Sequence, residues 1–191
     1  MADAETSEEV WLVRHGETEW SRDGRHTSTT DLPLTDQGRR VAESLCDRLD
    51  DEAFSLVLTS PRERARETAR LAGHGEAEVD DDLAEWDYGK LEGLTTPQIR
   101  ETYPDWSIWQ GPVPGGESAS QVTERLDRVI ARCRAVDGRV LLFGHGHSLR
   151  ALAARWLELP ATDGRHLRLD TATVSLLGWE RETPVVLRWN S

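Results

Sequence analysis

The stretch LVRHGETEW, residues 12–20, joins a short apolar run to an arginine and a histidine. Residues 10–14, VWLVR, have the composition of a short buried strand that ends at Arg14. His15 follows directly, before a glycine. The sequence therefore delivers two chemically active side chains to the end of a predicted strand.

Apolar runs of this kind recur along the chain between segments with helical periodicity. The predicted strands span residues 10–14, 55–60, 139–144, 174–179 and 185–189. The predicted helices span residues 35–51, 60–73, 118–136 and 148–159. This alternation predicts an α/β fold: a three-layer α/β/α sandwich with a mostly parallel sheet and helices on both faces.

End signals and apolar faces support these helices. The predicted N-caps are Thr35, Ser60 with Pro61 at the first helical position, and Ser118 with Gln121 as a capping box. The predicted stops are Gly73 and Pro160. The predicted core positions are Val41, Ala42, Leu45, Cys46 and Leu49 in the first helix, and Val122, Leu126, Val129, Ile130 and Cys133 in the third.

We expect residues 1–191 to form a single domain. Residues 80–117 interrupt the rhythm, because glycine and proline are frequent there. This segment predicts an irregular excursion that covers the active site, with a short helix at 96–103.

Charge narrows the choice of partner. The net charge is −12 and the sequence pI is near 4.9. Nucleic-acid affinity comes largely from clustered Lys and Arg, so we expect no nucleic-acid partner. An anionic ligand would need a local concentration of positive charge.

The chain also lacks the signals of export and membrane insertion. Residues 1–9, MADAETSEE, are acidic and contain no apolar core of a signal peptide. No apolar run approaches the roughly 18 residues of a membrane span. Cys46 and Cys133 fall on apolar helix faces, which favours free thiols in a reducing compartment. We expect a cytoplasmic protein with no membrane partner.

Ligands of open parallel sheets bind beyond the carboxyl ends of the strands. The residues delivered there are Arg14 and His15 from the first strand, Ser60 and Arg64 from the second, and His145 and His147 from the strand at 139–144. A single histidine at a strand end is more often a structural hydrogen-bonding group. The convergence of five basic side chains from three strands favours a functional site.

Three arginines follow the second strand. One interpretation is that they form an ordinary helix face exposed to solvent. Ser60, Arg64 and Thr68 share one face because they are spaced by four residues. Arg62 and Arg66 point elsewhere. Arg64 is therefore the one predicted to converge on the site.

These side chains suit phosphate chemistry. Guanidinium groups match a phosphate or carboxylate in a bidentate manner. A neutral imidazole can attack phosphorus, and a second, protonated histidine can hold a phosphate oxygen. Glu85, beside Trp86 in a partly apolar setting, suits a general acid for the leaving group.

Four motifs, LVRHGETEW, SPRERARETA, LAEWDYGKLEG and GHGHSLR, occur in the order and approximate spacing of a known family. The chain resembles the histidine phosphatase superfamily, in its phosphoglycerate mutase-like branch, over residues 10–178. The resemblance implies that His15 is the nucleophile, that Arg14, Arg64 and His145 form the phosphate pocket, and that Glu85 is the proton donor. It implies no metal and no organic cofactor.

Departures from the family pattern bear on the substrate. Ser21 stands where an asparagine commonly contacts the phosphate, and its hydroxyl can donate the same hydrogen bond. Ser28 replaces a usual glycine. The residues predicted to contact substrate are Ser21, Arg25, Thr27, Tyr88, Gly146 and His147, with His26 also at the mouth.

Other departures favour hydrolysis over phosphoryl transfer to a second hydroxyl. The pattern of cofactor-dependent mutases, which this chain resembles, has a lysine at the position of Thr96. The same pattern has an asparagine at the position of His147. We therefore expect a phosphatase acting on small phosphorylated metabolites. A cofactor-dependent phosphoglycerate mutase and a non-catalytic module that binds phosphorylated ligands are the alternatives.

Two further alternatives stay open. The motifs around Glu85 and His147 resemble those of acid phosphatases and sedoheptulose-bisphosphatase-type sugar phosphatases. Trp86, Tyr88, Trp106 and Trp109 then either lie over the pocket or pack the excursion onto the core.

The last predicted strand either pairs with a second copy in a homodimer or packs within one chain.

Overall fold

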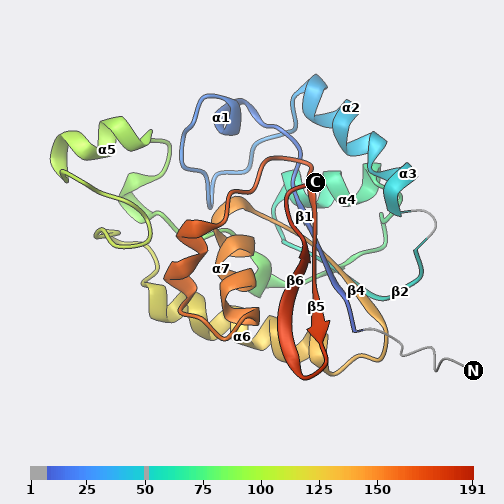
Figure 1. The fold of residues 1–191 in the computed structure, drawn as a ribbon. Helices are drawn as coiled ribbons and strands as arrows, with labels where there is room; N and C mark the ends of the chain where they lie inside the picture. Colours follow the sequence, from blue (N-terminus) through green and yellow to red (C-terminus); the bar gives the residue numbers. More distant parts are fainter. Residues whose placement is uncertain (1–7, 50–51) are drawn as a thin grey trace, which may run out of the picture.

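The computed structural model describes residues 8–49 and 52–191. Most of the acidic start, and residues 50–51 at the end of the first predicted helix, lie outside the described residues. The described chain folds as a six-stranded sheet between two layers of helices (Figure 1).

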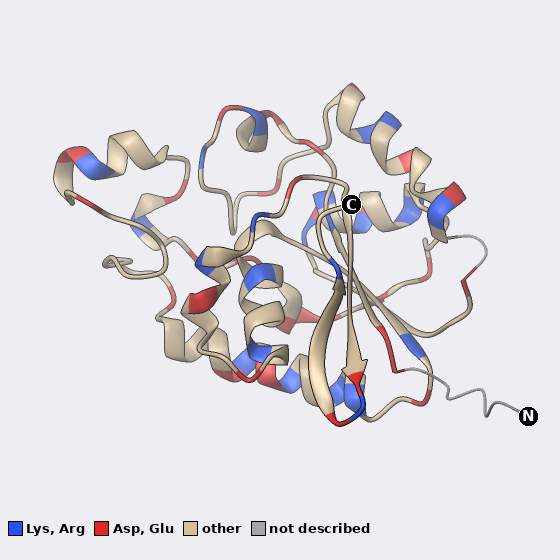
Figure 2. Cartoon of the chain, in the orientation of Figure 1, with Lys and Arg blue, Asp and Glu red and all other residues tan. Residues whose placement is uncertain are grey.

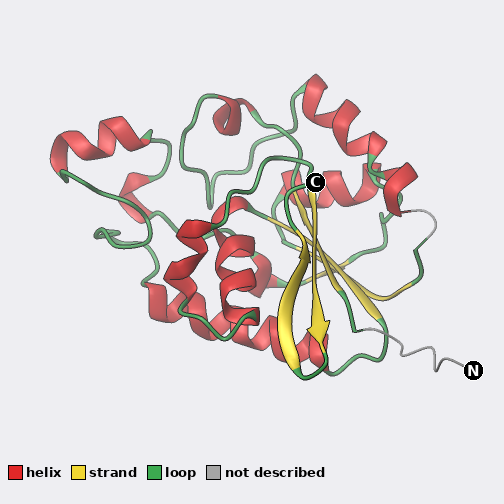
Figure 3. Ribbon diagram, viewed as in Figure 1, coloured by secondary structure: helices red, strands yellow, loops and turns green. Residues whose placement is uncertain are grey.

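The strands are β1 Val10–Arg14, β2 Phe54–Thr59, β3 Glu78–Val79, β4 Arg139–Gly144, β5 Val174–Glu180 and β6 Thr183–Arg188, in the order β3-β2-β4-β1-β5-β6. Strands β1, β2, β3 and β4 run parallel to one another. β5 runs antiparallel to both β1 and β6, so the sheet is mixed. The predicted α/β sandwich is confirmed, and β3 is a short strand that the sequence analysis missed (Figure 3).

The helices are α1 Glu19–Arg22, α2 Asp36–Ser44, α3 Cys46–Leu49, α4 Glu63–Leu71, α5 Thr96–Thr102, α6 Ala119–Arg134 and α7 Gly146–Trp156. Three short 3₁₀ helices are η1 Asp81–Leu83, η2 Gly89–Leu91 and η3 Ala161–His166.

Alternate side chains of the central strands enter two separate cores. Val10 and Leu12 of β1 face a core shared with α6, α7 and the excursion. Trp11 and Val13 face the other core, with α3 and α4. The predicted stripe of α6, from Val122 to Cys133, is buried in the first core.

Several helix boundaries differ from the predictions. The segment 35–51 divides at Leu45, whose N–H donates to the carbonyl of Ala42 rather than to a carbonyl four residues back. This tightening to an i−3 hydrogen bond separates α2 from α3. α7 begins two residues before Ser148 and ends at Trp156, ahead of Glu158 with a φ of 62°.

The predicted cap at Ser60 is wrong. α4 begins at Glu63, whose N–H donates to Asp31 Oδ1 at 2.8 Å. The Ser60 hydroxyl instead lies 2.7 Å from Nε2 of the buried His145 and accepts from the Arg62 N–H. The site thus recruits a side chain that sequence reasoning assigned to a helix end.

The excursion at 80–117 is fastened to α6 by charge. Acidic and basic residues alternate along this helix (Figure 2). Arg125, which is buried, donates to both carboxylate oxygens of Glu117 and to the carbonyls of Asp82 and Ala84. Arg125 therefore fixes the backbone on either side of the segment that carries Glu85.

We predict that Arg125→Met destabilises the chain by about 3–5 kcal/mol, because it leaves a partly buried carboxylate and two carbonyls without their donor. Arg128→Met is the matched control. Arg128 pairs with Asp82 from the same helix but is largely exposed, so its loss should cost below about 1 kcal/mol. Urea denaturation measures both, and equal losses would contradict the assignment.

Candidate active site

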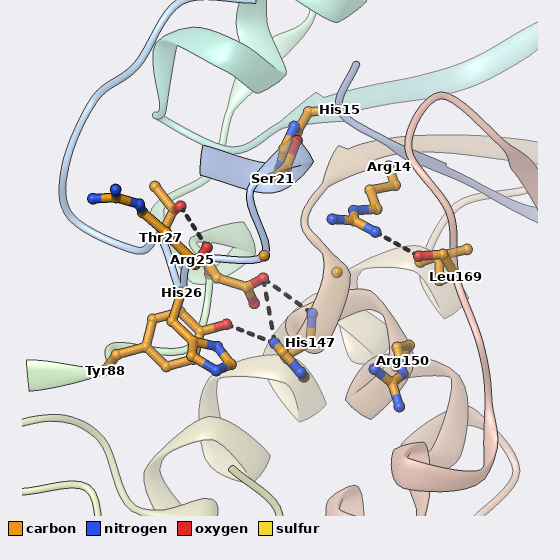
Figure 4. A pocket seen from close by; sticks show the side chains of 13 residues that line it. Arg14, His15, Ser21, Arg25, His26, Thr27, Tyr88, His147, Arg150 and Leu169 are labelled. Carbon is orange, nitrogen blue, oxygen red and sulfur yellow. Dashed lines mark hydrogen bonds and ion pairs between the residues drawn. The ribbon is translucent and has the colours of Figure 1, made fainter. Parts of the chain in front are cut away.

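The carboxyl ends of β1, β2 and β4 meet at one edge of the sheet. The His15 N–H donates to the Gly144 carbonyl at 3.0 Å, and the Ser60 N–H donates to the Phe143 carbonyl at 2.9 Å. A cavity of about 170 Å³ opens at this edge (Figure 4). Its lining includes the predicted residues Arg14, His15, Ser21, Arg25, Thr27, Glu85, Tyr88, Gly146 and His147.

His15 is held with one ring nitrogen toward the protein and the other unengaged. Its Nδ1 lies 2.7 Å from the Gly16 carbonyl, so Nδ1 carries the proton and donates it. Nε2, on the far side of the ring, has no hydrogen-bond partner among the described residues. Burial, followed by the charges of Arg64 and Arg14, lowers the pKa of His15 well below 6.5. The ring is therefore neutral at neutral pH, with a free lone pair at Nε2.

A close packing of glycines fixes the backbone beside His15. A side chain at Gly38, in the first turn of α2, would lie 2.2 Å from the Glu17 carbonyl. α2 therefore packs directly against residues 16 and 17. This contact holds the carbonyl that orients the His15 ring.

Arg14 lines the cavity with an unsatisfied donor. Its Nη1 donates to the Leu169 carbonyl at 2.6 Å, while its Nε is buried without a partner. A Cβ at Gly146 would lie 3.3 Å from this guanidinium, so glycine allows the close approach of the α7 backbone. A buried N–H without an acceptor is costly, which suits Arg14 to an anionic ligand.

Arg64 and His145 lie beside His15 but do not line the cavity, and both are fully buried. The rings of His15 and His145 are edge to face, 5.1 Å between centroids. Arg64 Nε donates to His145 Nδ1 at 3.2 Å, so His145 carries its proton on Nε2 and donates it to Ser60. Arg64, Thr68 and Ser60 are buried together, as their spacing predicts.

The geometry and burial of His145 argue against a second, protonated histidine in this structure, because His145 Nδ1 accepts from Arg64. Burial, then the charge of Arg64, lowers the pKa of His145 well below 6.5. His145 is therefore neutral in this state of the pocket. The positive charge beside His15 comes from the arginines alone.

Glu85 enters the cavity from the excursion, at the amino end of α7. Oε1 accepts from the N–H groups of Trp86 at 2.9 Å and Ser148 at 2.8 Å. Oε2 accepts from the N–H of His147 at 3.0 Å. Three backbone donors thus fix the carboxylate in the lining of the cavity, at the amino end of α7.

A second group of aromatic side chains lies around Glu85. The Tyr88 hydroxyl is 2.6 Å from His147 Nδ1. Burial raises the pKa of Tyr88 well above 10 and lowers the pKa of His147 well below 6.5, so Tyr88 donates and His147 accepts. His26 Nε2 lies 3.1 Å from Thr96 Oγ1, and burial lowers the pKa of His26 to about 4.

The structure corrects the expectation for Ser21. Its hydroxyl donates to the Thr18 carbonyl at 3.0 Å and accepts from the Thr18 N–H in the capping box of α1. The hydrogen that was expected to contact phosphate is therefore already used. Arg25 and Thr27 lie at the mouth, where the Thr27 hydroxyl donates to the Arg25 carbonyl.

Tryptophans do not cover the cavity. Trp86, Trp106 and Trp109 are buried in the core beneath the excursion, and none of them lines the cavity. Packing of the excursion onto the core therefore accounts for them, and Tyr88 is the one predicted aromatic that reaches the pocket.

The sequence analysis missed Gly24, Arg150 and Leu169 as lining residues. Arg150 belongs to the motif GHGHSLR, which was the available signal. Its guanidinium lies over Trp109, 4.7 Å from the ring centroid, and donates to the carbonyls of Gly164 and Arg165. Leu169 contributes a backbone carbonyl, for which the sequence carries no signal.

Within residues 8–49 and 52–191, no group of three or more His, Cys, Asp or Glu side chains is arranged to hold a metal ion. In the same ranges, no helix has the length and apolar character needed to cross a bilayer.

Comparison with known proteins agrees with this geometry. Residues 10–191 match the family model described as the histidine phosphatase superfamily, branch 1. The chain is 46% identical over 173 residues to an acid phosphatase of Mycobacterium tuberculosis, covering 88% of this chain and 85% of that one. It is 38% identical over 181 residues to sedoheptulose 1,7-bisphosphatase of Saccharomyces cerevisiae, covering 78% and 67%.

A solved structure of an open reading frame product from Mycobacterium tuberculosis has the same fold. It superposes with a TM-score of 0.92 at 43% identity, over 95% of this chain and 96% of that one. The family match spans all three strand ends that build the pocket. The chain therefore belongs to the histidine phosphatase superfamily, branch 1.

Proposed function

We propose that this protein is a metal-independent phosphomonoesterase that hydrolyses small phosphate esters through a phosphohistidine intermediate. The observation that carries the proposal is the state of His15: neutral, oriented by the Gly16 carbonyl, and with Nε2 free beside Arg14. The phosphatase names of the relatives support the same activity.

In the first proposed step, His15 Nε2 attacks phosphorus and forms an N–P bond while the ester O–P bond breaks. Arg14 and Arg64 stabilise the charge on the phosphoryl oxygens, with His145 as a neutral neighbour. Glu85, in its protonated form, gives its proton to the leaving alkoxide. His15 and Glu85 both line the cavity and are both held by backbone contacts, which supports attack by one and proton donation by the other.

In the second step, a water molecule gives a proton to Glu85 and attacks phosphorus. The N–P bond breaks, inorganic phosphate leaves, and His15 and Glu85 return to their starting states. Arginine side chains supply the positive charge that a metal ion supplies in metal-dependent enzymes.

The dimensions of the pocket favour compact, polar leaving groups. The cavity of about 170 Å³ corresponds to roughly five or six water molecules. Apart from Leu169 and two glycines, its lining is polar or aromatic-polar, with Arg25 and Arg150 on its outer parts. We infer that sugar phosphates and related metabolites are the substrates. We also infer that the protein acts in the cytoplasm.

We predict that His15→Asn lowers kcat by about 10³-fold or more on every ester, because no covalent intermediate forms. Phosphate release from a panel of esters, with a chelator present, measures it. The panel includes p-nitrophenyl phosphate, 3-phosphoglycerate and fructose and sedoheptulose bisphosphates. Release that requires a metal would contradict the proposal, and release only with an added bisphosphate primer would favour the mutase. Absence of release from every ester would favour a binding module.

We predict that Glu85→Gln separates substrates by leaving group. Alkyl phosphates, which need a protonated leaving group, should lose about 10²-fold to 10⁴-fold in kcat. p-Nitrophenyl phosphate has a good leaving group and should lose below about tenfold. Asp81→Asn, an exposed position in the same excursion, is the control. Equal losses on both kinds of ester would count against Glu85 as the acid.

The neutral nucleophile also predicts a dependence of stability on pH. His15, His145 and His147 have folded pKa values well below 6.5, so below that pH the unfolded chain binds protons that the folded chain does not. The free energy of unfolding should therefore fall as the pH drops below 6.5, by up to about 1.4 kcal/mol per histidine per pH unit.

Urea denaturation at neutral and mildly acidic pH measures this slope. His15→Asn should make the slope shallower, because one histidine no longer contributes. A stability that stays constant on acidification would show that these histidines take up protons in the folded chain over the same pH range as in the unfolded chain, and would contradict the lowered pKa of the nucleophile.

A further inference from the structure

The loop 27–30 is fastened on one side by a single carboxylate. Glu92 Oε1 accepts from the N–H groups of Ser28 at 2.9 Å and Thr30 at 3.0 Å. Glu92 Oε2 accepts from the Ser28 hydroxyl at 2.6 Å. Glu92 follows η2 and does not line the cavity.

The same loop meets a cation on its other side. Arg64 Nη1 donates to the Thr30 carbonyl at 3.0 Å, and Nη2 donates to the carbonyls of Thr27 at 3.1 Å and Ser28 at 3.2 Å. The peptide groups of the loop therefore lie between Glu92 and Arg64. Their N–H groups point to the anion and their carbonyls to the cation.

This arrangement determines how many N–H donors of Arg64 are free to bind a ligand. A guanidinium has five N–H donors. Nε donates to His145, and the loop carbonyls take one donor of Nη1 and both of Nη2. One Nη1 donor remains for an anion as long as the loop keeps its place.

Ser28 extends the same network to the excursion. Its hydroxyl donates to Glu92 and accepts from the Tyr88 N–H at 3.3 Å. Ser28 is buried. Glu92 thus orients the Ser28 hydroxyl, which also accepts from the N–H of Tyr88, a residue that lines the cavity.

We propose that Glu92, acting through Ser28 and Thr30, is a positioning residue that sets the orientation of the Arg64 guanidinium toward phosphate. The inference rests on the proposed function, in which Arg64 stabilises the phosphoryl group. Neither Glu92 nor Ser28 touches the substrate. The role of Glu92 is to hold the loop carbonyls that hold Arg64.

The test is Glu92→Gln, which replaces one carboxylate oxygen by an NH₂ donor facing the loop N–H groups. Binding of inorganic phosphate to the full chain, measured by isothermal titration calorimetry, should weaken about tenfold, as expected for loss of a charge-assisted hydrogen bond. KM for p-nitrophenyl phosphate should rise by a similar factor, with a smaller change in kcat. Glu92→Asp, which keeps the charge, should recover part of the affinity.

Two comparisons separate positioning from a loss of stability. Val129→Ala removes buried volume from α6, away from the loop, and should lower the melting temperature without changing phosphate affinity. In an Arg64→Met background, Glu92→Gln should weaken phosphate binding no further, because the group that Glu92 positions is absent. Additive losses in this double-mutant cycle, or an unchanged affinity in Glu92→Gln alone, would overturn the inference.

Direct binding keeps this test separate from the test of the proposed function. If the wild-type chain binds phosphate but hydrolyses no ester, the proposed function fails, and the double-mutant cycle on phosphate affinity still decides the role of Glu92. If the wild-type chain hydrolyses esters and the cycle is additive, the positioning role alone fails.

Discussion

The parallel pairing of β1 with β4, and of β4 with β2, is the constraint on which the site depends. This register sets Arg14 beside Gly144 and Thr59 beside Phe143, so the three strands end at one level. Three residues follow these strand ends and therefore lie close together: His15, Ser60 and His145. The chemistry of the pocket is thus a consequence of strand register.

Electrostatics adds a second layer to this geometry. The chain has 35 acidic and 23 basic residues, so arginines elsewhere find carboxylates easily. Arg14, Arg64 and Arg150 instead donate to backbone carbonyls and, for Arg64, to His145, and none forms an ion pair with a carboxylate among the described residues. Burial, followed by the charges of Arg64 and Arg14, lowers the pKa of His15 and keeps its ring neutral. In the proposed function, the same cations attract a phosphate and preserve the nucleophile that attacks it.

Strand and helix periodicity predicted most of the fold, and the strand ends predicted where the site lies. The errors have physical causes. Ser60 has the sequence signature of a cap, but its hydroxyl binds His145, a contact across 85 residues that no local pattern reveals. The hydroxyl of Ser21 is likewise taken by a capping box with Thr18. The protonation of His145 depends on the burial and the neighbouring charges that only the folded chain creates, and the Leu169 carbonyl has no side-chain signature at all.

The central claim is that His15 carries the phosphoryl group during turnover. The most direct measurement is to mix the chain with an ester substrate, quench rapidly in alkali, where phosphohistidine survives, and map the modified peptide by mass spectrometry. The account predicts phosphate on the peptide that contains His15, in the presence of a chelator and absent from His15→Asn. Turnover with no phosphate on this histidine, or with phosphate on another residue, would contradict the account.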